Sequence, residues 1–400
     1  MRLPIVMILA VLVVNTAVDY YIWRSLRRYS KGRLWPRIYL IFAALCLALL
    51  VATAVMPYRS GGESVLLATM WMLFIFIAIF IAKAVFVIFD LLSRIPGLFH
   101  KPFFRPLSWL GTFMAVLVLA AMLWGVLWGR FNLDVRKVEI ASPKVPLGFD
   151  GFTIAQISDL HVGTYGSDTT FLCDLVGEIN SLQPDLVVFT GDIVNRRTVE
   201  LEPFVNVLSR ISAPYGVYSI LGNHDYGDYT EWPNKQTKAE NMQLLKDLQR
   251  RMGWKMLNNA HDTLVAHGDT LMLIGVENIG DPPFPVYGSL AEAYPAGVSD
   301  CHAKVLLSHN PAHWDSDIQD SDSTNILLTL AGHTHAMQIT MLGTSPAAWR
   351  YHHWGGLYTD KKGQNLYVNI GAGTVGFPAR VGATPEITLF TLRHGTPRQR

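Results

Sequence analysis

The sequence predicts two joined parts, an all-α bundle of four transmembrane helices over residues 1–129 and an α/β domain over residues 130–400. Of the 400 residues, 50% are hydrophobic and only 16% are charged, which is too apolar for an ordinary soluble protein. Residues 1–129 carry twelve Lys and Arg against three acidic residues, a net charge of +9, whereas the remainder carries −7. This composition excludes a disordered chain, and the balanced total of +2 excludes a nucleic-acid binder that depends on bulk charge.

Four apolar stretches in the first part are each long enough to cross a hydrocarbon core of about 30 Å. A basic residue precedes the first stretch, but no small-x-small cleavage site follows it, so we expect a retained helix rather than a signal peptide. The four stretches are Leu3–Ile22, Ile38–Met56, Val65–Leu92 and Leu107–Gly129.

The loops between these stretches predict their orientation. Six basic residues separate the first two spans and three separate the last two, whereas the loop from Pro57 to Glu63 contains only Arg59. Basic loops remain on the cytoplasmic side of a membrane. We therefore expect a multi-pass protein of the plasma (inner) membrane, with both termini and the whole α/β domain on the extracytoplasmic side.

Ionisable residues within the spans leave two alternatives for the first part. Lys83 lies deep in the third span, and Asp19 and Asp90 lie near span ends. Such residues are functional candidates by default, so a transporter is one alternative. The spans contain no pair of helices broken by Gly or Pro of the kind that marks a substrate site, which favours a membrane anchor in which Lys83 is paired or snorkels.

From about Asn132 the chain alternates between short β-rich runs and amphipathic helical stretches. A domain of about 270 residues with this alternation is typical of an α/β fold with one sizeable core. Helical periodicity marks Thr169–Leu182 and Asn234–Arg251. The strand-like runs are Phe152–Ile157, Leu186–Phe189, Val217–Leu221, Val305–Leu307 and Ile326–Leu330.

Each of these five runs is followed directly by polar residues that can bind metal ions. Open α/β sheets place their sites at the carboxyl ends of strands, so we expect the five segments to converge. A single His or Asp at such a place is usually an ordinary loop residue, but five such segments in order make a strong constellation. They read Ser-Asp-Leu-His at 158–161, Thr-Gly-Asp at 190–192, Gly-Asn-His-Asp at 222–225, Ser-His-Asn at 308–310 and Gly-His-Thr-His at 332–335.

The donors in these segments are imidazoles and oxygens, and no cysteine is among them. This set suits divalent ions of hard to borderline character, namely Mn²⁺, Fe²⁺ or Zn²⁺. The three cysteines, Cys46, Cys173 and Cys301, cannot form a disulfide framework, and we expect buried free thiols.

With these motifs the chain resembles the calcineurin-like metallophosphoesterases, whose pattern is D-x-H, G-D, G-N-H-[DE], an isolated His, and G-H-x-H. Within that family it is most similar to the membrane-associated bacterial YaeI/YkuE-like branch. That branch has a V-x-[IV] strand before the first motif and a closing P-E-I-T-L strand, here Val138–Ile140 and Pro385–Leu389. The resemblance covers about residues 133–395. It implies a metallophosphoesterase domain of two mixed β-sheets packed as a sandwich and flanked by helices.

The resemblance also implies a binuclear centre that holds two divalent metal ions. Each ion would have three protein ligands of its own, and one carboxylate would bridge the pair. One ion would be bound by Asp159, His161 and His335, and the other by Asn223, His309 and His333, with Asp192 as the bridge.

Two further residues would be catalytic by the same resemblance. His224 would lie without a metal above the pair, contact the phosphate and protonate the leaving oxygen as general acid. Asp225 would orient His224. The implied function is a hydrolase acting on phosphoesters, with a phosphodiester favoured over a phosphomonoester. Because the domain is tethered at the membrane, a lipid-linked phosphate is favoured over a freely diffusing one.

The sequence leaves alternatives and departures open. A phosphatase or pyrophosphatase acting on a nucleotide-sugar lipid such as UDP-diacylglucosamine is one alternative, and a non-catalytic metal-binding membrane sensor is another. The family branch usually has Gly-Gly after G-H-T-H, where this chain has Ala336-Met337, which reshape the pocket or tighten a turn. The aromatic segment Trp349–Trp354 is a membrane-touching or substrate-covering loop, or an ordinary packed loop. No nucleic-acid partner is expected, and the oligomeric state is open.

Overall fold

The structure is a computed structural model that describes residues 5–30, 32–282, 285–294, 303–321 and 324–396. The chain divides into two compact units. Unit 1 comprises Met1–Leu127 with Gly376–Ala379, and unit 2 comprises Trp128–Val375 with Arg380–Arg400. The main division falls two residues before the domain boundary expected from the change in composition.

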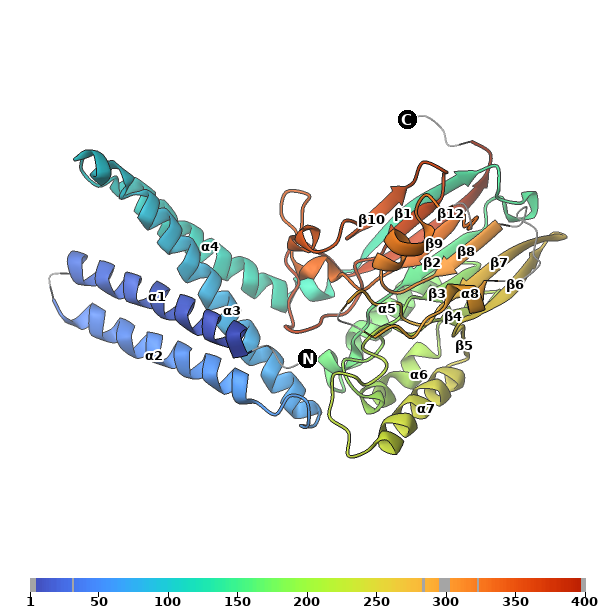
Figure 1. Ribbon diagram of the computed structural model, residues 1–400, viewed down its shortest axis with the longest axis horizontal. Coiled ribbons are helices and arrows are strands. Elements are labelled where there is room, and N and C mark those ends of the chain that lie inside the picture. The colour runs from blue at the N-terminus through green and yellow to red at the C-terminus, as the bar shows by residue number, and fades with distance from the viewer. Residues whose placement is uncertain (1–4, 31, 283–284, 295–302, 322–323, 397–400) are drawn as a thin grey trace. The chain divides into compact units, whose positions relative to one another are not determined.

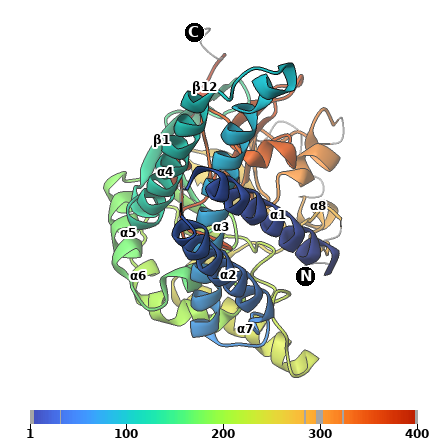
Figure 2. The same ribbon diagram turned by 90° about the vertical axis from the view of Figure 1, so that its left-hand side faces the viewer.

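Unit 1 consists of long apolar helices (Figures 1 and 2). Within the described residues, four helices have the length and hydropathy needed to cross a membrane. Arginines 24, 27 and 28 continue the first helix beyond its apolar stretch, and their long side chains can reach the membrane surface from there. The helices are α1 (Ile5–Tyr29), α2 (Leu34–Val55), α3 (Glu63–Leu92) and α4 (Arg105–Leu127).

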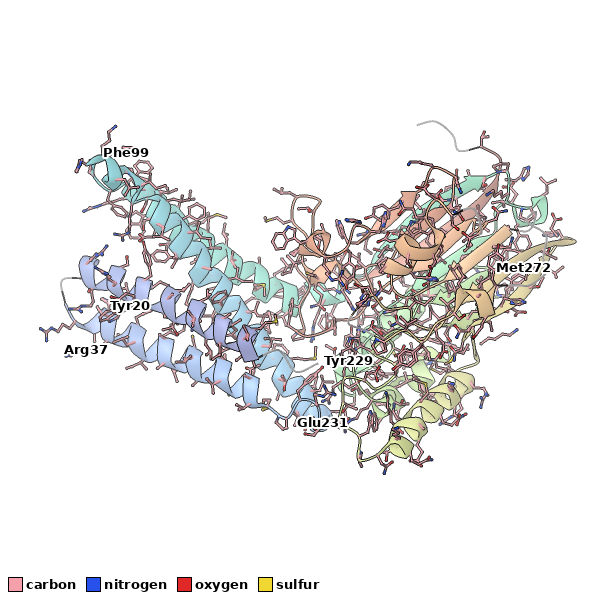
Figure 3. All side chains as sticks on the ribbon, viewed as in Figure 1. Tyr20, Arg37, Phe99, Tyr229, Glu231 and Met272 are labelled. Carbon is pink, nitrogen blue, oxygen red and sulfur yellow. The ribbon has the colours of Figure 1, made fainter. Side chains whose placement is uncertain are left out.

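The two basic connections lie at the same end of this bundle. The α1–α2 and α3–α4 connections are at one end in Figure 1, and the α2–α3 connection is at the other. Arg37 and Phe99, labelled in Figure 3, lie at the end with the basic connections. Most of the basic residues of the loops are therefore at one end of the bundle, which is the arrangement that the positive-inside rule needs.

Buried polar side chains connect the helices of unit 1. Lys83 of α3 lies 2.9 Å from Asp19 Oδ1 of α1 and donates to Asn15 Oδ1 at 3.0 Å. The Tyr39 hydroxyl of α2 donates to the same Asp19 oxygen at 2.6 Å. Lys83 is thus paired within the bundle, which removes the high cost of an isolated charge in hydrocarbon. A second cluster at Asp90 binds α1, α3 and α4 together through Tyr21, Arg94 and Ser108.

Unit 2 contains two six-stranded mixed sheets among the described residues. In the first sheet β2, β3, β4 and β5 are parallel, and β12 lies between β1 and β2. Its order is β1 (Asp134–Ser142), β12 (Glu386–His394), β2 (Thr153–Ile157), β3 (Leu186–Phe189), β4 (Val217–Ser219) and β5 (Trp254–Met256).

In the second sheet the inner strands are parallel and the two edge strands are antiparallel to their neighbours. The order is β10 (Gly356–Thr359), β11 (Asn365–Val368), β9 (Leu328–Ala331), β8 (Ala303–Leu307), β7 (Asp269–Gly275) and β6 (Ala260–Ala266). The helices are α5 (Thr170–Ser181), α6 (Val205–Leu208), α7 (Lys235–Arg251) and α8 (Leu290–Ala293), with a π-helix at Trp314–Ile318.

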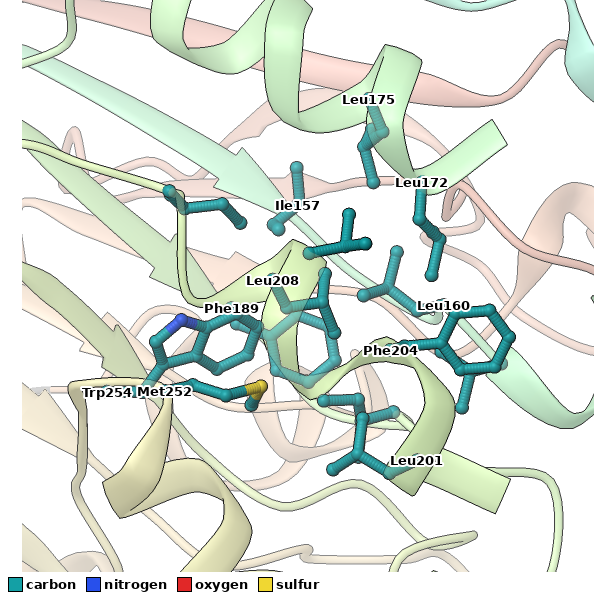
Figure 4. Packing of buried hydrophobic residues seen from close by; sticks show 14 of the residues in the cluster. Ile157, Leu160, Leu172, Leu175, Phe189, Leu201, Phe204, Leu208, Met252 and Trp254 are labelled. Carbon is teal, nitrogen blue, oxygen red and sulfur yellow. The ribbon is translucent and has the colours of Figure 1, made fainter. Parts of the chain in front are cut away.

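Strand periodicity separates the core of unit 2 into layers. In β2, Ile157 packs with α5 and α6, whereas Ile154 faces the second sheet. Likewise Phe189 of β3 packs on the helical side and Val188 between the sheets. Figure 4 shows the helix-side cluster, in which Leu172, Leu175 and Leu208 cover the first sheet. Helices cover the outer face of each sheet, so the sandwich of two mixed sheets expected from the resemblance is confirmed.

Several boundaries differ from the sequence-based expectations. The fifth strand begins at Leu328, later than the expected Ile326, although Ile326 and Leu327 are buried as well. The β6–β7 hairpin was not expected. Cys46 is buried and Cys173 half-buried, both as free thiols, and Cys301 lies outside the described residues.

Candidate metal centre

The five polar segments meet at one edge of the sandwich in unit 2. They follow β2, β3 and β4 of the first sheet and β8 and β9 of the second, in each case at the carboxyl end of a parallel strand. Parallel neighbours end at the same edge of a sheet, which is why residues more than 170 positions apart in sequence come together here. The side chains form two adjacent groups with metal-ligand geometry.

The first group consists of Asp159, His161 and His335, whose ligand atoms all lie within 4.8 Å of one another. The Nε2 atoms of His161 and His335 are 3.0 Å apart, and His335 Nε2 is 3.2 Å from Asp159 Oδ1. His161 Nδ1 lies 3.2 Å from the Val194 carbonyl, so the proton of that ring belongs on Nδ1 and Nε2 is left with its lone pair.

The second group consists of Asp192, His309 and His333, again with ligand atoms within 4.8 Å of one another. Asn223 belongs with them, because its Oδ1 lies 2.8 Å from His333 Nδ1 and 3.2 Å from His309 Nε2. His309 Nδ1 lies 2.7 Å from the Thr190 carbonyl, which again leaves Nε2 to face the group.

Asp192 lies between the two groups. Its Oδ2 is 3.2 Å from His309 Nε2 in the second group and 3.6 Å from His161 Nε2 in the first. Its Oδ1 accepts a hydrogen bond of 2.8 Å from the His224 amide. The carboxylate is therefore fixed by one oxygen and offers the other to both groups.

His224 lies beside the first group and belongs to neither. Its Nδ1 is 2.7 Å from the Asn195 carbonyl, which places a proton on Nδ1. Its ring contacts His161 edge-on, with centroids 4.8 Å apart, and stacks on Tyr229 at 4.2 Å. Tyr229 is labelled in Figure 3. Two rings and one hydrogen bond thus fix the orientation of this imidazole.

The expectation that Asp225 orients His224 is wrong. The Asp225 carboxylate accepts hydrogen bonds from the backbone amides of Asp192, Ile193 and Gly222, at 2.9 Å each. It therefore holds the loop that carries Asp192, and the partner of His224 is the Asn195 carbonyl. The side chain of Asp225 is turned toward backbone donors because the loop after β3 curls around it.

The backbone of the candidate ligands is strained. Asp159, His161, Asp192, His333 and His335 all have positive φ, between 43° and 75°. Side chains other than glycine seldom adopt this region, and such conformations cluster at functional sites, where the surrounding fold enforces them. The sharp turns that bring Asp159 and His161 to one side of their strand are of this kind.

The departure at Ala336-Met337 proves to be a tight turn. Ala336, Met337 and Gln338 follow His335 with φ of 50°, 45° and 60°, so four consecutive residues are left-handed. Glycine adopts this conformation without steric cost, which explains why Gly-Gly would suit the position. Ala336 is buried and Met337 is partly exposed, so the added bulk of Met337 points away from the core.

Burial and charge set the protonation of the site. Burial lowers the pKa of His161, and burial together with the neighbouring His309 lowers the pKa of His333 to about 3. Burial alone would also lower the pKa of His309, but the Asp192 carboxylate outweighs it and raises that pKa to about 9. Burial and Asp192 raise the pKa of Asp225 to about 7.

These features fit two cations. In the first group, two imidazole nitrogens 3.0 Å apart and a carboxylate oxygen converge on one point, as the ligands of a metal ion do. At the second group, an Asp192 carboxylate oxygen and the Asn223 amide oxygen both lie 3.2 Å from His309 Nε2, so oxygen and nitrogen donors converge there as well. The nitrogen and oxygen donors match a divalent ion of borderline hardness. Both groups thus have the chemistry of metal sites.

Tyr229 and Arg380 were missed by the sequence reasoning, whereas Tyr351 belongs to the segment Trp349–Trp354, which was named there as a membrane-touching, substrate-covering or packed loop. Tyr229 contacts Asn223 and His224, and the Tyr351 hydroxyl lies 2.9 Å from His333 Nε2. The buried Arg380 places a guanidinium nitrogen 3.2 Å from His335 Nδ1. Each of the three lies in a loop, where no periodicity marks it.

Comparison with known proteins agrees with this geometry. Residues 152–337 match the family model "Calcineurin-like phosphoesterase", and residues 1–130 match "Probable Calcineurin-like phosphoesterase, transmembrane domain". The metallophosphoesterase YkuE of Bacillus subtilis is 32% identical over 270 residues, which cover 65% of this chain and 86% of that protein. The chain belongs to the calcineurin-like metallophosphoesterases.

Two other relatives share parts of this metallophosphoesterase. A transmembrane protein with a metallophosphoesterase domain from Danio rerio is 28% identical over 291 residues, which cover 70% of this chain and 62% of the relative. The UDP-2,3-diacylglucosamine pyrophosphatase LpxG of Chlamydia muridarum is 39% identical, but over 98 residues only, 24% of this chain and 30% of that protein. The family and the four helices make the chain a membrane-linked phosphoester hydrolase with candidate metal-binding residues.

Proposed function

We propose that this metallophosphoesterase is a binuclear-metal phosphodiesterase whose domain, residues 130–400, is anchored by the helices of residues 1–129. The observation that carries the proposal is the position of Asp192, with Oδ2 3.2 Å from His309 and 3.6 Å from His161. A carboxylate in that position can bridge two ions. Asp159, His161 and His335 would hold the first ion, and Asn223, His309 and His333 would hold the second.

Two divalent ions, Mn, Fe or Zn, supply Lewis-acid polarisation of phosphoryl oxygens and lower the pKa of water when bound. The chain's own residues do the rest. Asp192 holds the two ligand groups in register through Oδ2, and its Oδ1 fixes the backbone of His224. Asp225 keeps the Asp192 loop in place by accepting from the backbone amides of Asp192, Ile193 and Val194.

His224 acts as the general acid. Its Nδ1 is committed to the Asn195 carbonyl, so Nε2 at the far side of the ring is the atom that exchanges a proton with substrate. An imidazolium there attracts the phosphate and then protonates the leaving oxygen. Without that proton the oxygen is a poor leaving group. Stacking on Tyr229 keeps the ring from rotating away.

The substrate is a phosphodiester, in a lipid-linked form, at the extracytoplasmic surface of the inner membrane. Six residues connect α4 to β1. At no more than about 3.6 Å per residue, the seven steps from Leu127 to Asp134 span at most about 25 Å, so the first strand of the domain begins near the bilayer. The positive-inside rule, applied to the basic connections at one end of unit 1, supports both termini on the extracytoplasmic side.

A second candidate is hydrolysis of a nucleotide-sugar lipid such as UDP-diacylglucosamine, favoured by the short match to a pyrophosphatase of that substrate. That substrate is cytoplasmic, so this candidate requires the opposite topology. Reporter fusions after Arg400 separate the two. An extracytoplasmic phosphatase reporter should be active, and a fluorescent reporter that matures only in the cytoplasm should be dark.

Purified full-length protein tests the activity. Metal content and turnover of a chromogenic phosphodiester should both depend on Asp192, so Asp192→Asn should lose metal and at least 10³-fold in rate. His224→Ala should lose about 10²- to 10⁴-fold with metal retained. The matched controls carry the same substitutions at exposed residues, namely Asp174→Asn in α5 and His261→Ala in β6. Full turnover in either site variant, or metal-independent turnover, would refute the proposal.

A further inference from the structure

Large apolar side chains gather on an exposed loop that directly follows the Gly-His-Thr-His motif. Leu342 is 96% exposed, Trp349 90% and Met341 71%. Single exposed apolar residues are ordinary on a protein surface, but contiguous exposed apolar clusters mark sites of interaction. We call residues 337–349, with Met337, Met341, Leu342 and Trp349 as their exposed apolar members, the apolar loop.

The tip of the apolar loop is a strained turn with a leucine at its apex. Met341 and Thr344 exchange backbone hydrogen bonds of 2.9 and 3.1 Å across Leu342 and Gly343. The two central residues, Leu342 and Gly343, have φ of 53° and 78°, which is typical of a type I′ turn. Asn-Gly is the pair such a turn prefers, so leucine here costs both backbone strain and exposed apolar surface.

The base of the loop is held firmly. The Thr340 amide donates to the Val381 carbonyl at 2.8 Å, and the Ser345 hydroxyl donates to the Ala336 carbonyl. Ser345 also accepts from the Ala347 amide and so caps the 3₁₀-helix Pro346–Trp349. The exposed residues are therefore presented by an ordered frame.

The loop is also joined to the candidate metal centre. Its first residue follows His335 by two positions, and Tyr351, two residues beyond Trp349, contacts His333 at 2.9 Å. The two ends of the loop thus lie beside the candidate ligands His335 and His333. The chain itself supplies the partner, because only six residues separate β1 from α4, a helix long and apolar enough to cross a membrane. Tryptophan and leucine are residues that partition into the membrane interface.

We propose that the apolar loop inserts into the interface of the phospholipid bilayer in which the chain is anchored and places the metal centre at the lipid headgroups. The proposal extends the proposed function, hydrolysis of a lipid-linked phosphodiester. Only the predicted effect on turnover depends on that function. The insertion itself is a matter of geometry and is tested without catalysis.

The first test locates the loop in the full-length protein. A nitroxide is attached to Leu342→Cys, in a background without native cysteines, and the protein is reconstituted in phosphatidylethanolamine–phosphatidylglycerol vesicles. Collision with oxygen should exceed collision with a water-soluble nickel chelate. The same label at His267→Cys, in the exposed turn between β6 and β7, should show the reverse. A label at 342 as open to nickel as that at 267, or closed to both reagents, overturns the proposal.

The second test uses Leu342→Asn, which removes the apolar apex and gives the turn its preferred Asn-Gly pair. The variant should fold at least as well as the wild type. Turnover of a phosphodiester lipid in the same vesicles should fall about tenfold, and turnover of a soluble chromogenic phosphodiester should not change. An equal fall in both, or no fall in either, overturns the proposal. If the wild type hydrolyses neither substrate, the proposed function fails, while the label at residue 342 still decides the location of the loop.

Discussion

The side-chain amide of Asn223 donates a hydrogen bond of 2.8 Å to the hydroxyl of Tyr229, and the ring of the same tyrosine stacks on His224. Only the oxygen of an asparagine amide can bind a metal, and the amide can rotate to present either atom. The Tyr229 hydroxyl occupies the Nδ2 side, so Oδ1 faces His309 and His333. One tyrosine thus orients both a candidate ligand and the candidate acid.

Tyr229→Phe keeps the ring and removes the hydroxyl. Because partners of metal ligands contribute about 10- to 100-fold to affinity, we expect the second metal ion to bind at least tenfold more weakly, with the first unchanged. Metal content after equilibration with buffered free metal measures this. Tyr215→Phe removes a hydroxyl that bonds the Val265 carbonyl away from the site and should have no effect. Equal affinity of Tyr229→Phe and wild type for the second metal ion would show that the Tyr229 hydroxyl does not orient Asn223.

Glycine at 222 allows Asp192 to approach the turn. A Cβ at Gly222 would lie 2.2 Å from Asp192 Oδ1, so Gly222→Ala should displace the carboxylate and lower turnover at least 10²-fold. Gly177 of α5 has open space around its Cβ position. Gly177→Ala should leave turnover unchanged and stabilise the domain by about 0.5–1 kcal/mol. Steady-state rates and thermal unfolding compare the two variants, and similar behaviour would contradict the close approach.

His313 should make the domain acid-labile. It is buried, its Nδ1 lies 2.7 Å from Ser308 Oγ, and burial lowers its pKa to about 4. The unfolded chain takes up this proton near pH 6.5, so between pH 6.5 and 4 unfolding binds a proton and stability falls as pH falls. The loss is about 3 kcal/mol at 1.36 kcal/mol per pKa unit.

The unfolding temperature at pH 7 and pH 4 measures that loss. His313→Gln keeps a polar partner for Ser308 and cannot titrate, so its unfolding temperature should fall about 6 °C less than that of the wild type, at about 2 °C per kcal/mol. His267→Gln, in an exposed turn, is the control and should track the wild type. Parallel curves for wild type and His313→Gln would show that another group carries the acid sensitivity.

The Lys83–Asp19 pair should behave as a structural pair within the bilayer. Lys83→Met leaves the Asp19 carboxylate without its cation and should cost about 3–5 kcal/mol, whereas Lys83→Met with Asp19→Asn should recover most of that loss. Thermal stability of the full-length protein in detergent measures both. Asn15 and Tyr39 complete a polar cluster at this pair, which is the feature that a transporter would need. Retained turnover and stability in the double variant favour the anchor.

The positions of the motifs were predictable because functional residues of open α/β sheets lie at the carboxyl ends of the strands. Asp159, Asp192 and His309 all follow buried runs that the sequence marks clearly, and parallel packing then brings them to one edge. The role of Asp225 was not predictable in this way. Its partners are backbone amides of a loop whose shape depends on a left-handed residue, Asp192, and no local pattern encodes that shape.

The remaining surprises arise from loops and helix ends. Tyr229 and Tyr351 reach the site from segments without periodicity, so only the folded chain shows their contacts. The first helix continues through its arginines to Tyr29 because a polar helix end is stable where it can meet water, although hydropathy alone ends the span at Ile22.

Strand β12 is late in the sequence but lies inside the first sheet, so the order of synthesis matters for this sheet. Residues 386–394 leave the ribosome after every other strand that the structure describes, yet they lie between β1 and β2, paired with β1 over nine residues. Until they arrive, both of those strands present open edges that can pair with other chains. A premature stop before Glu386 would therefore produce an aggregation-prone, split sheet rather than a slightly shorter enzyme.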